Sequence, residues 1–157
     1  VMDALSKILN IKDRAQKLPH KEGVYNRDWL ITKTNLLFIL EWLIGYSAKR
    51  GVPILITSII RPRIAGVSVS DTHEDGRAFD ISVHGWMMKD IADCVEECNR
   101  VFSKVGAASK SDGVKRSAIF EQDQFDASGK QIKWKHIHFQ CAKIINDGTK
   151  KSFQINT

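Results

Sequence analysis

The sequence predicts one α+β domain in which a small antiparallel sheet packs against helices. Helical segments dominate the first third of the chain and most strand-like segments come later, a segregation that is typical of α+β folds. The 157 residues suffice for one hydrophobic core, since a chain of this length buries about two-thirds of its unfolded surface. No repeat or linker divides residues 1–157, so we expect a single domain.

Three segments have the three- and four-residue spacing of apolar residues that is typical of helices. The first is Asp3–Leu18, which a proline follows. The second and longest is Asp28–Arg50, whose high apolar content predicts a central, buried helix. The third is Trp86–Ser103. Its expected buried face consists of Met87, Ile91, Cys94, Val95, Cys98 and Phe102.

Four later segments are short and rich in β-branched residues, as strands are. Ile54–Ile60 is expected to be a buried strand, and Arg77–Val83 a second one. Ser117–Gln122 and Lys133–Cys141 are expected to pair as a hairpin with a long loop. Two segments without periodicity are expected to be loops: Arg61–Asp75 and Lys104–Lys115.

The composition, with 43% hydrophobic and 27% charged residues, is that of an ordinary globular protein and excludes a disordered or collagen-like chain. The chain has 24 Lys and Arg against 18 Asp and Glu, and its net charge of +6 predicts affinity for polyanions. Nucleic acids, anionic lipids and bacterial wall polymers all agree with this charge. Three cysteines are too few for a disulfide framework, so we expect reduced thiols.

No segment is expected to span a membrane. The longest apolar stretch, Leu36–Tyr46, is interrupted by Glu41 and is shorter than the roughly 20 residues that a transmembrane helix needs. Residues 1–7 show no basic region followed by an apolar core. We therefore expect no secretory signal, and synthesis in the cytoplasm.

His136 and His138 lie one residue apart in a segment that is expected to form a strand. Alternate residues of a strand point to opposite sides, so both imidazoles share one face while Ile137, Phe139 and Cys141 share the other. Packing alone does not explain this pattern, although a histidine pair on an exposed sheet face can also be without function. The histidine face is a candidate metal site, from which Cys141 is excluded.

His73 and Asp80 form a second cluster. His73 lies in a loop and Asp80 on the following strand, and Gly76 between them permits a tight turn that can bring the two side chains together. A surface ion pair is the simpler explanation of this cluster alone. If His136 or His138 joins it, two imidazoles and one carboxylate form the three-ligand set that is common at catalytic zinc sites. Zinc held in this way activates water and polarises carbonyl groups, which suits amide hydrolysis.

Three motifs follow one another along the chain: Ser58-Ile59-Ile60-Arg61, His73-x-x-Gly76-x-Ala78-x-Asp80 and His136-Ile137-His138. Their order and separations resemble those of one superfamily. It comprises the zinc D-Ala-D-Ala carboxypeptidases, the vancomycin-resistance dipeptidases, the phage L-alanyl-D-glutamate endopeptidases and the Hedgehog signalling domain. The motifs span about half of the chain. The resemblance implies that residues 1–157 form a zinc-peptidase-like domain with the small α+β fold of this superfamily.

The resemblance also implies roles for individual residues. His73, Asp80 and His138 would bind one zinc ion, and His136 would be a neighbouring catalytic histidine or would support the ligands. Arg61 would bind the substrate's carbonyl group or the developing oxyanion, because a fixed cation stabilises charge that grows in the transition state. Arg61 could also brace the loop that carries His73.

The sequence departs from the superfamily at two places. Asp71 lies two residues before the first expected ligand, where Ser or Thr is usual. The superfamily also has Glu or Asp as a general base shortly before the third ligand, whereas residues 130–135 contain no carboxylate. A general base must reach the attacking water through a hydrogen bond. Four residues are candidates for this role: Glu121, Asp123, Asp126 and His136.

These patterns favour a zinc-dependent peptidoglycan peptidase that is similar to the lysins of phages and prophages and acts on the bacterial cell wall. It would be either a stem-peptide endopeptidase that cuts after L-Ala or a DD-carboxypeptidase that removes the terminal D-Ala. The missing base leaves an alternative, a non-hydrolytic zinc-containing module that binds the wall or a partner. A metal-free, basic nucleic-acid-binding domain is the second alternative; it rests on charge alone and is the least favoured.

Overall fold

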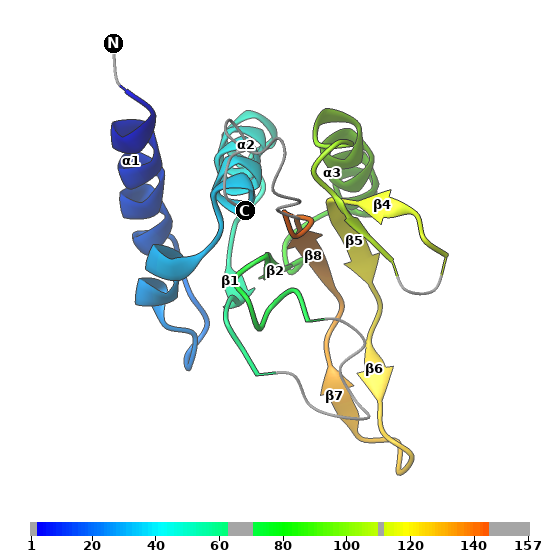
Figure 1. Ribbon diagram of the computed structural model, residues 1–157. Coiled ribbons are helices and arrows are strands. Elements are labelled where there is room, and N and C mark those ends of the chain that lie inside the picture. Colours follow the sequence, from blue (N-terminus) through cyan, green and yellow to red (C-terminus); the bar gives the residue numbers. More distant parts are fainter. Residues whose placement is uncertain (1–2, 63–70, 110–111, 145–157) are drawn as a thin grey trace.

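The computed structural model describes residues 3–62, 71–109 and 112–144. The helices are α1 (Ala4–Gln16), the 3-10 helix η1 (Asn26–Ile31), α2 (Thr34–Arg50) and α3 (Met88–Val101) (Figure 1). The strands are β1 (Ile56–Ser58), β2 (Ala78–Ser82), β3 (Ala107–Ala108), β4 (Lys115–Arg116), β5 (Ala118–Glu121), β6 (Gln124–Phe125), β7 (Gln131–Lys133) and β8 (His136–Gln140). Within these residues, no helix is long and apolar enough to cross a membrane.

Four strands form an antiparallel sheet in the order β1-β2-β8-β5. The strands β2 and β8 are its centre, and their register places Asp80 directly opposite His138. On the other side of β8, Glu121 of β5 lies opposite His136. Two short hairpins, β3–β4 and β6–β7, accompany this sheet in the described part of the chain. The predicted α+β class with an antiparallel sheet is therefore confirmed.

One face of the sheet is packed against helices. The helix α2 contacts β8 and α3 contacts β5, while α1 packs against α2 and η1 (Figure 1). In this apolar layer Phe79 stacks on Phe139 at 4.9 Å between ring centroids, and Trp29 packs edge-on against Phe79. Because neighbouring residues of a strand face opposite sides, Asp80 and His138 face away from this core. The expected division into an apolar face and a histidine face is thus present in β8.

The longest predicted helix is divided in two. The sequence predicts a continuous helix over residues 28–50, but the chain is extended at Thr32 and Lys33, between η1 and α2. The Thr32 hydroxyl donates to the carbonyl oxygen of Trp29, and the Lys33 amide donates to the carbonyl oxygen of Gly76 at 2.9 Å. Apolar periodicity does not reveal this break, because the break depends on a contact with a distant residue.

The helix α2 is nevertheless the buried central helix that the sequence predicts. Six of its side chains are buried in the core: Leu36, Leu37, Ile39, Leu40, Leu43 and Tyr46. Its end at Gly51, which adopts a left-handed backbone conformation, agrees with the expected end of the segment.

Other segments differ in detail from their predictions. The strand β1 is shorter than the expected 54–60, and its register with β2 shifts between Ile56 and Ser58. Met87 precedes α3 and is exposed, so it does not belong to the buried face of that helix. The expected loop over 104–115 contains β3, which pairs with β4, and the loop of the C-terminal hairpin forms β6 and β7. Of the loop expected at 61–75, residues 63–70 lie outside the described residues.

Candidate metal centre

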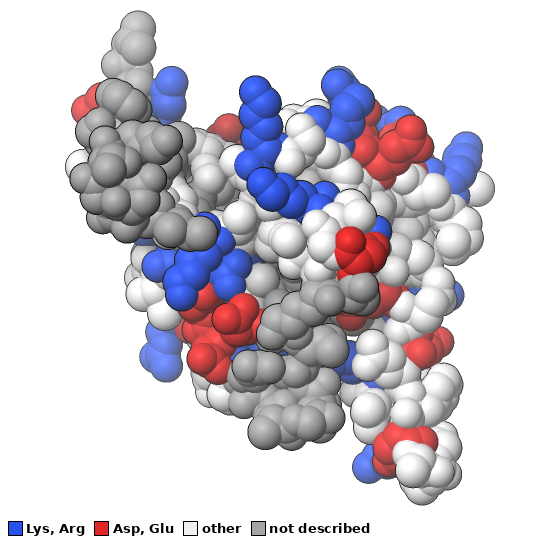
Figure 2. Space-filling model, turned by 45° about the vertical axis from the view of Figure 1, so that its right-hand side comes forward, with Lys and Arg blue, Asp and Glu red and all other residues white. Residues whose placement is uncertain are grey.

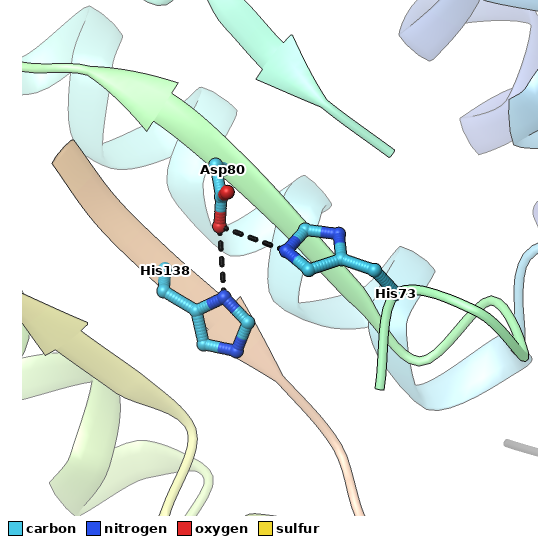
Figure 3. A group of neighbouring side chains, drawn as sticks. All are labelled: His73, Asp80 and His138. Carbon is cyan, nitrogen blue, oxygen red and sulfur yellow. Dashed lines mark hydrogen bonds and ion pairs between the residues drawn. The ribbon is translucent and has the colours of Figure 1, made fainter. Parts of the chain in front are cut away.

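His73, Asp80 and His138 meet on the side of the sheet that faces away from the apolar core (Figure 3). The Nε2 atom of His73 lies 3.2 Å from Oδ1 of Asp80, and Nδ1 of His138 lies 2.8 Å from the same oxygen. One potential ligand atom from each residue lies within 4.8 Å of the other two, and all three side chains are buried. This group could hold one metal ion.

The sheet and a turn position the three side chains in different ways. Asp80 and His138 are the middle residues of the paired strands β2 and β8, so the backbone ladder sets their separation. His73 lies in the turn that precedes β2. This turn ends at Gly76, whose φ is +77°. A Cβ atom at Gly76 would also lie 3.0 Å from the carbonyl oxygen of Ile31, so this position requires glycine both for its conformation and for space.

A buried arginine holds the turn that carries His73. The Nε atom of Arg77 donates to both carboxylate oxygens of Asp75 at 2.8 and 2.9 Å, and Nη2 donates to Asp71 at 3.0 Å. Its Nη1 atom donates to the carbonyl oxygen of Cys141, just beyond β8. Asp71, the departure from the superfamily motif, therefore pairs with Arg77. The clamp role of Arg77 was not predicted, although Asp71 and Asp75 on either side of a predicted ligand could have indicated it.

The second ring nitrogen of each candidate ligand histidine faces an oxygen. Nδ1 of His73 lies 2.8 Å from the carbonyl oxygen of Ile59, and Nε2 of His138 lies 2.9 Å from Oε1 of Gln140. Metal-ligating histidines usually donate their other N–H to such an acceptor, which orients the ring. Gln140 was not among the predicted residues, although its spacing of two from His138 places it on the same face of β8.

The pKa shifts of the triad follow from burial and from the proximity of the three groups. Burial lowers the pKa of His73, which favours the neutral imidazole that a metal requires. Burial also lowers the pKa of His138, but its hydrogen bond with Asp80 and the charge of that carboxylate outweigh burial and raise it. Burial would raise the pKa of Asp80, yet the interactions with both histidines hold it well below its usual range. Asp80 is therefore a carboxylate at neutral pH.

Three further side chains that the sequence analysis singled out lie beside the triad. Nη2 of Arg61 is 3.8 Å from Oδ2 of Asp80, and the guanidinium is partly exposed. Nε2 of His136 is 3.7 Å from the same oxygen and 3.3 Å from Oε2 of Glu121. This nitrogen is buried and makes no well-aligned hydrogen bond within the described residues. A buried nitrogen without a hydrogen-bond partner is typical of a site in which a bound ligand supplies that partner.

The four candidates for a general base separate into two groups. Glu121 and His136 face each other beside the triad. The interaction with His136 lowers the pKa of Glu121, and Glu121 and Asp80 together raise the pKa of His136 against the opposing effect of burial. Asp123 instead accepts from the Lys135 amide at 2.6 Å. Asp126 organises the exposed turn of the β6–β7 hairpin, where it accepts hydrogen bonds from Ser128 and Lys130.

Compared with known protein families, curated proteins and solved structures, the chain matches none of them. The assignment of the site therefore rests on its own chemistry. Two imidazoles and one carboxylate agree with the donor set of catalytic zinc sites, in which a fourth position is left for water or substrate. Cys141, just beyond β8, is not in the group of described residues that could hold a metal.

Proposed function

We propose that the protein is a zinc-dependent peptidase that cleaves the stem peptides of bacterial peptidoglycan, similar in role to phage and prophage lysins. The observation that carries this proposal is the buried group of His73, Asp80 and His138, with one ligand atom from each within 4.8 Å of the others. Three protein ligands that leave one position open are typical of catalytic rather than structural zinc. When bound, zinc supplies Lewis acidity that activates water and polarises a carbonyl group.

The residues around the triad would supply the remaining parts of a hydrolytic site. The partly exposed Arg61 is a cation 3.8 Å from Asp80, and it would stabilise negative charge on the substrate oxygen as the peptide bond is attacked. The Glu121 carboxylate would accept the proton of the attacking water and return it to the leaving amine, and His136, whose Nε2 lies 3.3 Å from that carboxylate, would support it. This pair would replace the carboxylate that is absent from residues 130–135.

The substrate class is inferred from the three sequence motifs, which resemble those of peptidoglycan peptidases. The net charge of +6 supports an anionic polymer such as the bacterial wall. Figure 2 shows that basic and acidic side chains alternate on one face of the molecule, without the continuous basic surface that nucleic-acid binding favours. We propose synthesis in the cytoplasm and action at the cell wall.

One observation favours a second function, a zinc-containing module that binds without hydrolysis. Lys135 and its neighbours lack the carboxylate that precedes the third ligand in the peptidases, and Glu121 comes from the neighbouring strand instead. If the Glu121 carboxylate does not reach the attacking water to accept its proton, the metal centre would serve recognition or folding only.

Digestion of purified sacculi by the zinc-loaded protein, with the fragments identified by mass spectrometry, tests the proposal. We expect either cleavage after L-Ala or release of the terminal D-Ala. A Glu121→Gln variant should bind zinc as the original protein does but cleave about 100-fold or more slowly, since this is the usual contribution of a general base. Absence of both products from the fully zinc-loaded protein would contradict the peptidase and favour the binding module.

A further inference from the structure

Gln140 lies at the end of β8 with its side chain against His138, and it is almost completely buried. Its Oε1 atom is 2.9 Å from Nε2 of His138. Its Nε2 atom donates to two backbone carbonyl oxygens, those of Ala107 at 3.2 Å and Arg116 at 3.1 Å. These two residues are partners in the small β3–β4 hairpin, so the hairpin and the metal centre meet at one amide group.

The neighbours of Gln140 determine which way its amide points. Carbonyl oxygens only accept hydrogen bonds, so the NH₂ group must face Ala107 and Arg116 and the amide oxygen must face His138. An amide oxygen also only accepts, and Nε2 of His138 must therefore carry a proton. Nδ1 of the same ring faces Oδ1 of Asp80 and is the nitrogen that is left for a metal.

We propose that Gln140 is a positioning residue of the metal centre: it holds His138 so that Nδ1, and not Nε2, is the metal ligand. The ring of His73 is oriented in a similar way but through its other nitrogen. The carbonyl oxygen of Ile59 accepts from Nδ1 of His73 and leaves Nε2 facing Asp80. The acceptor for His73 belongs to the backbone and cannot be removed by substitution. The acceptor for His138 belongs to a side chain, so its contribution can be measured.

The test compares three variants and depends on the metal centre of the proposed function, but not on peptidase activity. Gln140→Met keeps the approximate shape and removes the acceptor. Gln140→Glu keeps an oxygen acceptor for His138 but loses the two N–H donors to the β3–β4 hairpin. Gln131→Met is the matched control, because Gln131 lies in the β6–β7 hairpin and, among the described residues, donates to the nearby Lys133 carbonyl oxygen.

Zinc affinity, measured by competition with a chromophoric chelator, is the first readout. We expect Gln140→Met to bind zinc about 10- to 100-fold more weakly, as is usual when the partner of a ligating histidine is lost. Gln140→Glu should bind zinc within a few-fold of the original protein although it is less stable to heat, and Gln131→Met should bind normally. Equal zinc affinity in Gln140→Met and the original protein, or an equal loss in Gln140→Met and Gln140→Glu, would overturn the proposal.

Long-range proton–nitrogen NMR spectra of the histidine rings are the second readout, because they identify directly which ring nitrogen binds the metal and which carries a proton. In the zinc-loaded original protein and in Gln140→Glu, we expect Nδ1 of His138 to be metal-bound and Nε2 to be protonated. Zinc on Nε2 of His138 in the original protein, or no zinc binding at all, would overturn the proposal. If zinc binds through Nδ1 of His138 but sacculi are not cleaved, the peptidase function would be contradicted while the proposed role of Gln140 would stand.

Discussion

The candidate ligands come from two regions of the molecule that are held in different ways. Asp80 and His138 lie opposite each other in the central strands β2 and β8, where backbone hydrogen bonds determine their separation. His73 lies in a turn whose position depends on a few side-chain contacts, mainly those of Arg77, and on Gly76. The sheet therefore supplies a pre-organised half of the site, whereas the turn supplies a half that single substitutions can displace.

Removal of a sheet ligand should have the largest effect. In the original protein, zinc at about 1,000 times its Kd should raise the free energy of unfolding by about 4 kcal/mol. His138→Ala removes the ligand in β8 and should abolish this stabilisation, which denaturant unfolding with and without zinc would measure. His84→Ala is the control, since His84 is exposed and lies outside the metal-binding group. Equal stabilisation of both variants by zinc would show that His138 is not a ligand.

Removal of Arg77, whose hydrogen bonds hold the turn that carries His73, should have the second-largest effect. Arg77 is buried, and Arg77→Met would break its bonds to Asp71, Asp75 and Cys141; we expect a loss of about 2–4 kcal/mol, since the freed carboxylates are partly open to water. Zinc affinity should fall as well, because His73 would no longer be held. Arg100→Met removes an exposed ion pair with Glu97 and should change little. If both variants bound zinc like the original protein, the turn would not need its clamp.

A smaller change to the same turn should be visible at Gly76. Gly76→Ala would place a Cβ atom 3.0 Å from the Ile31 carbonyl oxygen at a φ of +77°, so we expect a loss of about 2–3 kcal/mol and weaker zinc binding. Gly129 has a φ of +87° with open space around it, and Gly129→Ala should cost only about 1 kcal/mol and leave zinc affinity unchanged. Calorimetric unfolding and zinc titration distinguish the two. If Gly76→Ala and Gly129→Ala bound zinc with similar affinity, the position of the turn that carries His73 would not matter for zinc binding.

The smallest expected effect is the pH dependence of stability, which should differ between His138 and His73. The pKa of His138 is raised, so its paired proton stabilises the metal-free fold below its ordinary pKa, and this contribution is lost as pH rises through the raised value. The pKa of His73 is lowered, so stability is lost as pH falls below its ordinary value, where the unfolded chain takes up a proton.

Between the lowered pKa of His73 and the raised pKa of His138, zinc would therefore displace a proton from His138 but not from His73. Its affinity should increase about tenfold per pH unit up to the raised pKa of His138. Titrations at several pH values, each corrected for buffer binding, would measure this slope. A slope near that for two displaced protons would show that His73 is also protonated before zinc binds.

Much of the site could be predicted from sequence because it depends on local geometry. The alternation of a strand places His136 and His138 on one face, and the turn at Gly76 allows His73 to approach Asp80. The residues that could not be predicted depend on the register between strands. Glu121 could not be separated from Asp123 as a neighbour of His136, because a slip of β5 against β8 by two residues would exchange these positions and leave the same side chains on each face.

The fold shows the same limit. The apolar spacing predicted the central helix, but it gave no indication of the extended break at Thr32 and Lys33, where the Lys33 amide bonds to Gly76. That contact ties the start of α2 to the turn of His73, two segments that are far apart in the sequence. Arg77 and Gln140 were missed in part for the same reason, since Arg77 also donates to the carbonyl oxygen of Cys141 and Gln140 to that of Ala107, and only the folded chain brings these groups near.

The stoichiometry of zinc binding tests the central claim most directly. Equilibrium dialysis against a zinc buffer, followed by elemental analysis, should give one zinc ion per chain for the original protein and for His84→Ala. The same measurement should give no tightly bound zinc for Asp80→Asn, which removes the carboxylate that both ligand histidines face. A metal-free original protein under these conditions, or an Asp80→Asn variant that retains a full equivalent with unchanged affinity, would contradict the assignment of this site.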